Sequence, residues 1–153
     1  MNLNIACALI TLTLASCHQP STETISSSKL PLAGTWRLVT GTLIEKGDTA
    51  VTDYTKNISF IKIINDTHFA FLQHDLAKGK DSAVFVAGGG LYSLADSLYT
   101  EHLEYCNDRA WEGNDFSFAI TIKNDTLVQR GVEKVESAGV DRINIETYVR
   151  EKK

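Results

Sequence analysis

Three polar side chains lie within short runs that contain β-branched or aromatic residues at alternate positions, the pattern of strands that pack around a core. Lys62 lies in NISFIKII, Glu101 in SLYTEHLEYC and Gln129 in TLVQRGVEKV. An unpaired buried charge is costly, so Lys62 and Glu101 would have to pair with each other or face a ligand if both point inward. Glu101 could also act as a general acid or base if its pKa were shifted. These residues are the first candidates for a functional site.

The elements that must position them are short β-branched and aromatic runs bounded by Asn, Asp, Gly or Ser. We expect eight strands, over residues 35–44, 57–64, 68–75, 83–94, 97–106, 116–123, 126–135 and 142–151. Short polar turns such as Asn65-Asp66, Asp96-Ser97 and Asn124-Asp125 join antiparallel neighbours. The sequence therefore predicts an all-β fold, an eight-stranded up-and-down antiparallel β-barrel whose interior could hold one small ligand. A two-sheet sandwich is the alternative.

The turns also sort the side chains, because residues directly opposite each other in a hairpin share a face. Around Asp96-Ser97 the residues expected inside are Tyr92, Leu94, Tyr99, Glu101, Leu103 and Tyr105. The other two hairpins add Phe60, Lys62, Ile64, Phe69, Phe71, Phe118, Ile120, Ile122, Leu127 and Gln129. In the last strand Glu146, Tyr148 and Arg150 share one face, and alternation alone does not decide whether that face is inward.

A polar interior of this kind favours a ligand cavity with an apolar wall and a few orienting polar groups. The candidate ligand-binding residues are Lys62, Phe69, Phe71, Tyr92, Tyr99, Glu101, Gln129 and Tyr148. One alternative is a filled barrel, in which a Lys62–Glu101 pair forms a structural network with tyrosine hydroxyls and the function lies in surface loops such as residues 107–115, which carry Trp111. Catalysis by Glu101 is a further alternative.

The remaining reactive side chains carry little sign of catalysis or metal binding. His68, His74 and His102 fall on the face assigned to solvent, and no Cys/His metal spacing occurs. Cys106 is expected to be a small half-buried strand residue rather than a nucleophile. The net charge of −4, without a basic cluster, argues against a nucleic-acid partner. We therefore expect no cofactor and no metal, and the sequence leaves the oligomeric state open.

The first residues resemble a bacterial lipoprotein signal. IACALITLTLASC is an apolar stretch of signal-peptide length, and Leu14-Ala15-Ser16-Cys17 resembles a lipobox. We expect a signal peptide over residues 1–16, lipidation at Cys17, a flexible tether over 17–32 and the barrel domain over 33–153. On this hypothesis the membrane is a partner through the lipid anchor. His18 after the lipobox favours a location in the cell envelope at the outer membrane, facing the periplasm.

AGGGLY, residues 87–92, places three consecutive glycines inside an expected strand. A glycine run in a strand marks a bulge, a sharp bend of a barrel wall or a close approach to the backbone. It lacks the spacing of a phosphate loop, and no helix follows it. We interpret it as a bend that helps to close the barrel.

Several of these segments together resemble a known family. They are GTWRLV, IKIINDTHFAF, GGGLYSLADSLYTEHLEY, DTLVQRG and ETYVRE. In this order they resemble the lipocalin-like domains of unknown function found in Bacteroidota lipoproteins, within the calycin superfamily. The resemblance implies that Trp36 packs at the closed end of the barrel beneath Arg150, as a cation-π pair. The ligand class follows from the mixed polar and apolar interior instead, which predicts a small hydrophobic or amphipathic molecule. Tyr148-Val149-Arg150 reverses the Arg-x-Tyr clamp of fatty-acid-binding proteins, which makes a carrier of that type doubtful.

Overall fold

The structure is a computed structural model that describes residues 30–80 and 82–152. Its strands are β1 (Gly34–Glu45), β2 (Asp48–Asp53), β3 (Ile58–Ile64), β4 (His68–Asp75), β5 (Phe85–Ala95), β6 (Leu98–Cys106), β7 (Asp115–Lys123), β8 (Thr126–Val135) and β9 (Val140–Arg150). Two single-turn 3-10 helices, η1 (Arg109–Trp111) and η2 (Glu136–Ala138), lie in the β6–β7 and β8–β9 connections. The all-β prediction is confirmed, and each expected strand is present with its ends shifted by at most two residues.

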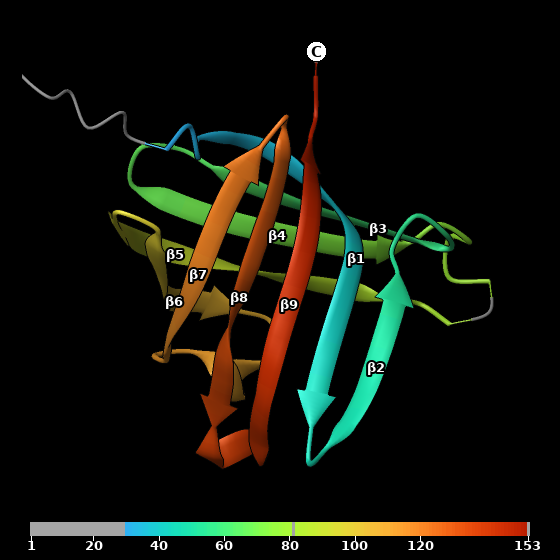
Figure 1. The fold of residues 1–153 in the computed structure, drawn as a ribbon. Coiled ribbons are helices and arrows are strands. Elements are labelled where there is room, and N and C mark those ends of the chain that lie inside the picture. Colours follow the sequence, from blue (N-terminus) through green and yellow to red (C-terminus); the bar gives the residue numbers. More distant parts are fainter. Residues whose placement is uncertain (1–29, 81, 153) are drawn as a thin grey trace, which may run out of the picture.

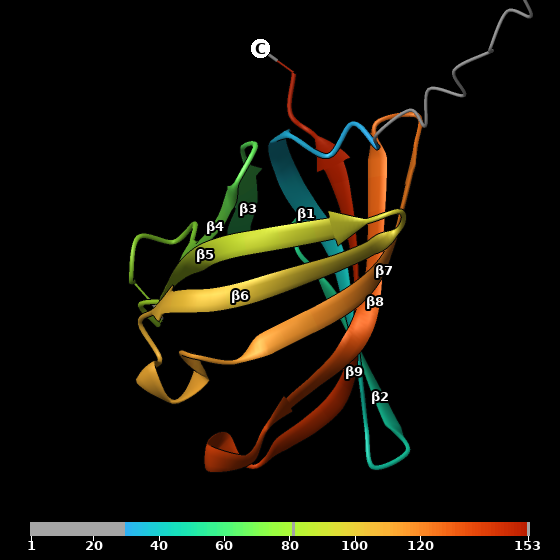
Figure 2. The same ribbon diagram turned by 90° about the vertical axis from the view of Figure 1, so that its left-hand side faces the viewer.

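Strands β3 to β9 pair with their neighbours in chain order, all antiparallel, and β1 pairs with both β3 and β9. This last pairing closes the sheet into an eight-stranded barrel (Figures 1 and 2). The up-and-down β-barrel is therefore confirmed, and the two-sheet sandwich is wrong. The short polar turns explain the topology, because they allow each strand to pair only with the strand beside it.

The structure adds one strand that the sequence does not predict. β2 is exposed along its whole length and pairs only with β1. The first residues of β1, Gly34 to Arg37, pair with β3, whereas Thr40 to Glu45 pair with β2. β2 thus occupies the part of the β1 edge that β3 leaves free, and it extends the wall beyond the barrel (Figure 1). The strand escapes prediction because DTAVTD contains no buried, apolar face.

One end of the barrel is closed by the residues before β1 and by the end of β9. Trp36 is fully buried and donates from Nε1 to the carbonyl of Leu32 at 2.8 Å. The Arg150 guanidinium lies 4.0 Å from the centre of the Trp36 ring and donates to the carbonyls of Pro31 and Ala33. The contact that the family resemblance implied is thus present. Leu32, which we expected in the tether, is buried in the core, so packing begins slightly before residue 33.

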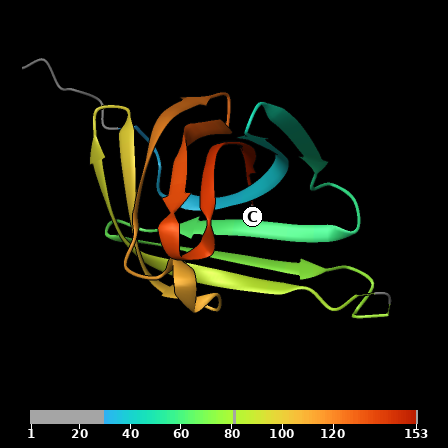
Figure 3. The same ribbon diagram turned by 90° about the horizontal axis from the view of Figure 1, so that it is seen from below.

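The other end of the barrel carries the β1–β2 hairpin, η1 and η2, and is seen from below in Figure 3. η1 and η2 meet across it, where the Ser137 hydroxyl donates to the carbonyl of Ala110 at 3.1 Å. We call this end the mouth of the barrel. It lies opposite the end that Trp36 fills, so any internal space must open here.

The glycine run lies opposite a β-bulge of β6, and the bend of the barrel wall that we expected from it stays a prediction. Gly89 pairs with Tyr105 and Gly90 with Leu103, so Glu104 of β6 is the extra residue. A Cβ atom on Gly90 would lie 2.0 Å from the His102 carbonyl oxygen, which leaves no space for a side chain. The bulge also shifts the alternation of β6. Tyr105 is 68 % exposed, so our expectation that it points inward is wrong.

The expected signal peptide, the expected lipidation site Cys17 and all but the last residues of the expected tether lie outside the described residues. Within residues 30–80 and 82–152, no helix has the length and apolar character needed to cross a membrane.

Candidate functional site

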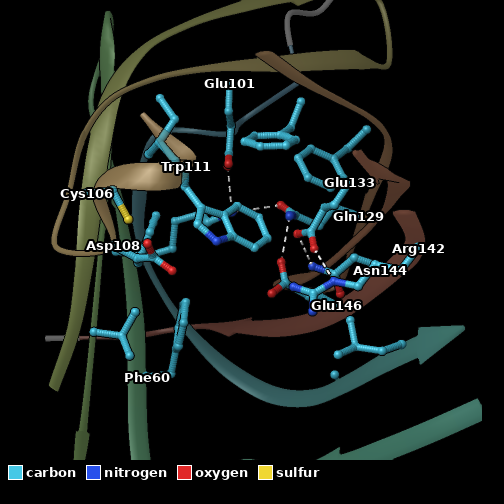
Figure 4. A pocket seen from close by; sticks show the side chains of 18 of the residues that line it. Phe60, Glu101, Cys106, Asp108, Trp111, Gln129, Glu133, Arg142, Asn144 and Glu146 are labelled. Carbon is cyan, nitrogen blue, oxygen red and sulfur yellow. Dashed lines mark hydrogen bonds and ion pairs between the residues drawn. The ribbon is translucent and has the colours of Figure 1, made fainter. Parts of the chain in front are cut away.

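A cavity of about 470 Å³ lies inside the barrel at its mouth (Figure 4). Its apolar lining includes Phe60, Phe71, Leu103, Phe116 and Phe118. These residues come from β3, β4, β6 and β7, where alternation along each strand turns every second side chain inward. The volume lies within the range of small-molecule sites, and so does the combination of an apolar wall with a few polar groups.

A buried ion pair forms the polar part of the cavity floor. Lys62 Nζ donates to Glu101 Oε1 at 2.6 Å and to Gln129 Oε1 at 3.1 Å. The three residues are only 2 %, 6 % and 1 % exposed, respectively. They come from β3, β6 and β8, and the hairpin rules predicted that all three point inward. That placement is confirmed. The Lys62–Glu101 pair that we described as an alternative is also present, and it lies in the lining of an open cavity.

The hydrogen-bond chain continues from Gln129 to the last strand. Gln129 Nε2 donates to Glu146 Oε2 at 2.6 Å, and the Tyr148 hydroxyl donates to the same oxygen at 2.8 Å. The structure thereby resolves the orientation of β9, whose Glu146 and Tyr148 face inward. Burial raises the pKa of the Tyr148 hydroxyl well above its ordinary value, and the negative charge of Glu146 adds to this effect. Tyr148 is therefore held as a neutral hydrogen-bond donor.

A second polar cluster lies nearer the mouth. Glu133 accepts from Arg142 Nε and from Asn144 Nδ2, each at 2.7 Å. The Arg142 guanidinium lies 5.3 Å from the centre of the Trp111 ring. Trp111 in turn packs on Phe116, with ring centres 5.7 Å apart. Trp111 is thus half-buried over the cavity (Figure 4). The η1 loop therefore packs against the barrel interior and does not form a separate surface.

The structure brings five of the eight candidate residues to the cavity. These are Lys62, Phe71, Glu101, Gln129 and Tyr148. The other three, Phe69, Tyr92 and Tyr99, do not line it. They also point inward, but they lie nearer the closed end, where the Tyr92 hydroxyl donates to the Asn65 carbonyl at 2.8 Å. The Tyr99 hydroxyl is fully buried without a hydrogen-bond partner among the described residues.

On β8 and β9, four polar residues of the cavity are missing from the candidates that the sequence predicts, namely Glu133, Arg142, Asn144 and Glu146. A signal for each is present. Glu133 lies four residues after Gln129 and therefore on the same face of β8. Arg142, Asn144 and Glu146 share the face of Tyr148 on β9. The apolar residues on the opposite face of β9, such as Ile143 and Ile145, obscure this signal, because the inward face of a strand is normally its apolar one.

The cavity residues offer binding groups more readily than reactive ones. Cys106 lines the cavity, and burial raises the pKa of its thiol, which disfavours the reactive thiolate. His102 Nδ1 lies 2.8 Å from Asp115 Oδ1 on the outer surface of the barrel, and neither residue lines this cavity. In the part of the chain that the structure describes, no group of three or more His, Cys, Asp or Glu side chains could hold a metal ion. The arrangement suits recognition of a ligand by hydrogen bonds, charge and aromatic contacts.

No protein-family model matches the chain, and no curated protein is significantly similar to it.

Proposed function

We propose that this protein is a lipid-anchored, lipocalin-like binding protein of the cell envelope that holds a small, partly apolar molecule in its barrel. The observation that carries the proposal is the cavity of about 470 Å³, which combines aromatic walls with buried polar groups at an open barrel end. A barrel that served only as a scaffold would gain more stability from an apolar, filled interior.

The anchoring part of the proposal rests on the first residues of the sequence. Leu14-Ala15-Ser16-Cys17 supports lipidation at Cys17, and the Ser/Thr-rich segment that follows supports a tether between membrane and barrel. The test is mass spectrometry of the protein purified from bacterial membranes. We expect an acylated N-terminal Cys17 and, for Cys17→Ser, transfer of the protein to the soluble fraction. An unmodified Cys17 in the membrane-purified protein would contradict the anchor.

The binding part is tested with N-phenyl-1-naphthylamine, a neutral apolar fluorophore, titrated into the full chain carrying Cys17→Ser. We expect one saturable site. Val86→Trp places a large side chain on the cavity wall and should abolish binding, because Val86 lines the cavity. Val132→Trp is the matched control, since Val132 is 55 % exposed and does not line the cavity. Equal binding by both variants, or no saturable binding by the parent protein, would contradict the proposal.

A further inference from the structure

We propose that the ligand of this cavity is an organic cation, an ammonium group carried on an apolar body, and that Glu146 is the residue that pairs with it. This inference rests on the proposed binding function and names its ligand class. The observations that support it are the balance of charge in the cavity, the hydrogen-bonding state of each ionic group, and the aromatic rings around Glu146.

The cavity lining carries more negative than positive groups. Its cationic side chains are Lys62 and Arg142, and its carboxylates are Glu101, Asp108, Glu133 and Glu146. Two cations against four carboxylates leave a formal charge of −2. A space with this excess attracts cations and repels carboxylates or phosphates, and its apolar walls strengthen both effects because they exclude water.

Both cations of the lining are already paired. Lys62 contacts Glu101 at 2.6 Å, and Arg142 contacts Glu133 at 2.7 Å. An anionic ligand would have to compete with a protein carboxylate for either cation, and the displaced carboxylate would remain in the cavity without a partner. Such an exchange offers no gain, since an uncompensated buried charge is strongly unfavourable.

Glu146 differs from the two other glutamates in the cavity. Its Oε2 atom accepts hydrogen bonds from two neutral donors, Gln129 and Tyr148. It forms no ion pair with a lysine, arginine or histidine in the described ranges 30–80 and 82–152. The two neutral donors hold the carboxylate in place without cancelling its charge, so the charge is available to a ligand cation.

Aromatic rings lie next to this carboxylate. The Phe60 ring centre lies 6.0 Å from that of Tyr54 and 6.3 Å from that of Tyr148, and all three residues line the cavity. The Tyr54 ring lies 2.9 Å from the position that a Cβ atom on Gly41 would take, and Gly41 pairs directly with Glu146 across β1 and β9. Tyr54 therefore lies near the same carboxylate. Aromatic faces attract cations, and several rings around one anion form the usual environment of a bound ammonium group.

The rest of the cavity suits the apolar part of such a ligand. Phe60 and Glu146 border the same opening, which Trp111 partly covers (Figure 4). From Phe60 the aromatic wall continues to Phe71, whose ring centre is 5.9 Å away in a stacked arrangement. An ammonium group at Glu146 can therefore extend an alkyl or aromatic body along this wall.

Isothermal titration calorimetry of the Cys17→Ser full chain with three probes of equal length but different charge tests the inference. The probes are octylammonium, octan-1-ol and octanoate. We expect octylammonium to bind about tenfold or more tightly than octan-1-ol, and octanoate to bind most weakly, because only the ammonium group can form a hydrogen bond of opposite charge with Glu146. Glu146→Gln should remove the preference for octylammonium over octan-1-ol.

Glu136→Gln is the matched control. It makes the same change of charge on η2 near the mouth, at an exposed residue that does not line the cavity, and it should keep the preference. If Glu146→Gln does not fold, Phe60→Leu takes its place and should weaken octylammonium binding more than octan-1-ol binding. Octanoate binding as tightly as octylammonium, or a preference unchanged in Glu146→Gln, would overturn the inference while the binding function stands. Binding of none of the probes would overturn both.

Discussion

Lys62 and Glu101, separated by 39 residues in sequence, meet inside the barrel with Nζ and Oε1 2.6 Å apart. Only 3 % of the lysine side chain and 8 % of the glutamate side chain are exposed. The pair links β3 to β6 through the interior, and Gln129 of β8 accepts a second hydrogen bond from the lysine. The charges therefore stabilise each other at a place where either one alone would be costly.

Removing one member of this pair should destabilise the barrel strongly. We expect Lys62→Met to lower the free energy of unfolding by about 3 to 5 kcal/mol, because it leaves the Glu101 carboxylate buried without a counter-ion. The double variant Lys62→Met/Glu101→Leu should recover most of this loss. Urea denaturation of the parent protein, of Lys62→Met, of Glu101→Leu and of the double variant measures the coupling energy between the two side chains. Single-variant losses that simply add in the double variant would show that the two charges do not stabilise each other.

The unpartnered hydroxyl of Tyr99 predicts a stabilising substitution. A buried hydroxyl without a hydrogen bond costs about 1 to 3 kcal/mol. Tyr99→Phe removes that hydroxyl and keeps the ring, which packs 5.3 Å from the Tyr92 ring. We expect an unchanged or higher melting temperature. The matched variant Tyr148→Phe should be less stable than the parent protein, because it removes the donor to Glu146. A loss of stability in Tyr99→Phe would indicate that its hydroxyl has a partner in solution.

The bulge beside Gly90 predicts a site that tolerates no side chain. Gly90→Ala would place a methyl group 2.0 Å from the His102 carbonyl oxygen, and two paired backbone segments would have to move apart. We expect a large loss of stability in thermal denaturation followed by circular dichroism. Gly113→Asn serves as the comparison, because Gly113 has open space around it and asparagine tolerates its positive φ. Similar melting temperatures for the two variants would contradict the assigned register of β5 and β6.

The tyrosines predict an alkaline limit to stability. Burial is the main cause that raises the pKa of Tyr54, Tyr92, Tyr99 and Tyr148 above 10.0 in the folded protein. The unfolded chain then releases these protons at lower pH than the folded chain. The free energy of unfolding is therefore unaffected by these tyrosines below about pH 10 and declines as the pH rises above it. Urea denaturation at a series of alkaline pH values should show this decline. A smaller decline is expected for Tyr99→Phe, and an equal one would contradict the assignment.

Alternation around the polar turns is sufficient to place Lys62, Glu101 and Gln129 inside the barrel from the sequence alone. Alternation reports which face a residue is on, but not how far along the barrel it lies. It therefore assigns Tyr99 to the ligand site, although Tyr99 lies nearer the closed end, outside the cavity lining. Alternation also places Tyr105 on the wrong face, because the bulge at Glu104 inserts one residue into β6. The glycines of β5 opposite Glu104 are the sign of this bulge in the sequence.

The last strand shows a different limit of the sequence. Its inward face carries Asn144, Glu146 and Tyr148, whereas its outward face carries Ile143, Ile145 and Val149. The usual rule that the apolar face is buried fails here, because the inward face borders a cavity rather than packed side chains. A polar strand face that points into the barrel thus indicates a binding site. The sequence alone does not reveal it, because the inward face of β9 is known only once its pairing with β1 and β8 is known.

The measurement that tests the central claim most directly is the position of octylammonium in the bound state, by isotope-filtered nuclear Overhauser spectroscopy on the labelled Cys17→Ser chain. We predict contacts from the methylene group next to the nitrogen to the rings of Tyr54, Phe60 and Tyr148. Contacts only to exposed outer residues such as Phe85 and Tyr105, which are 65 % and 68 % exposed, would contradict the claim.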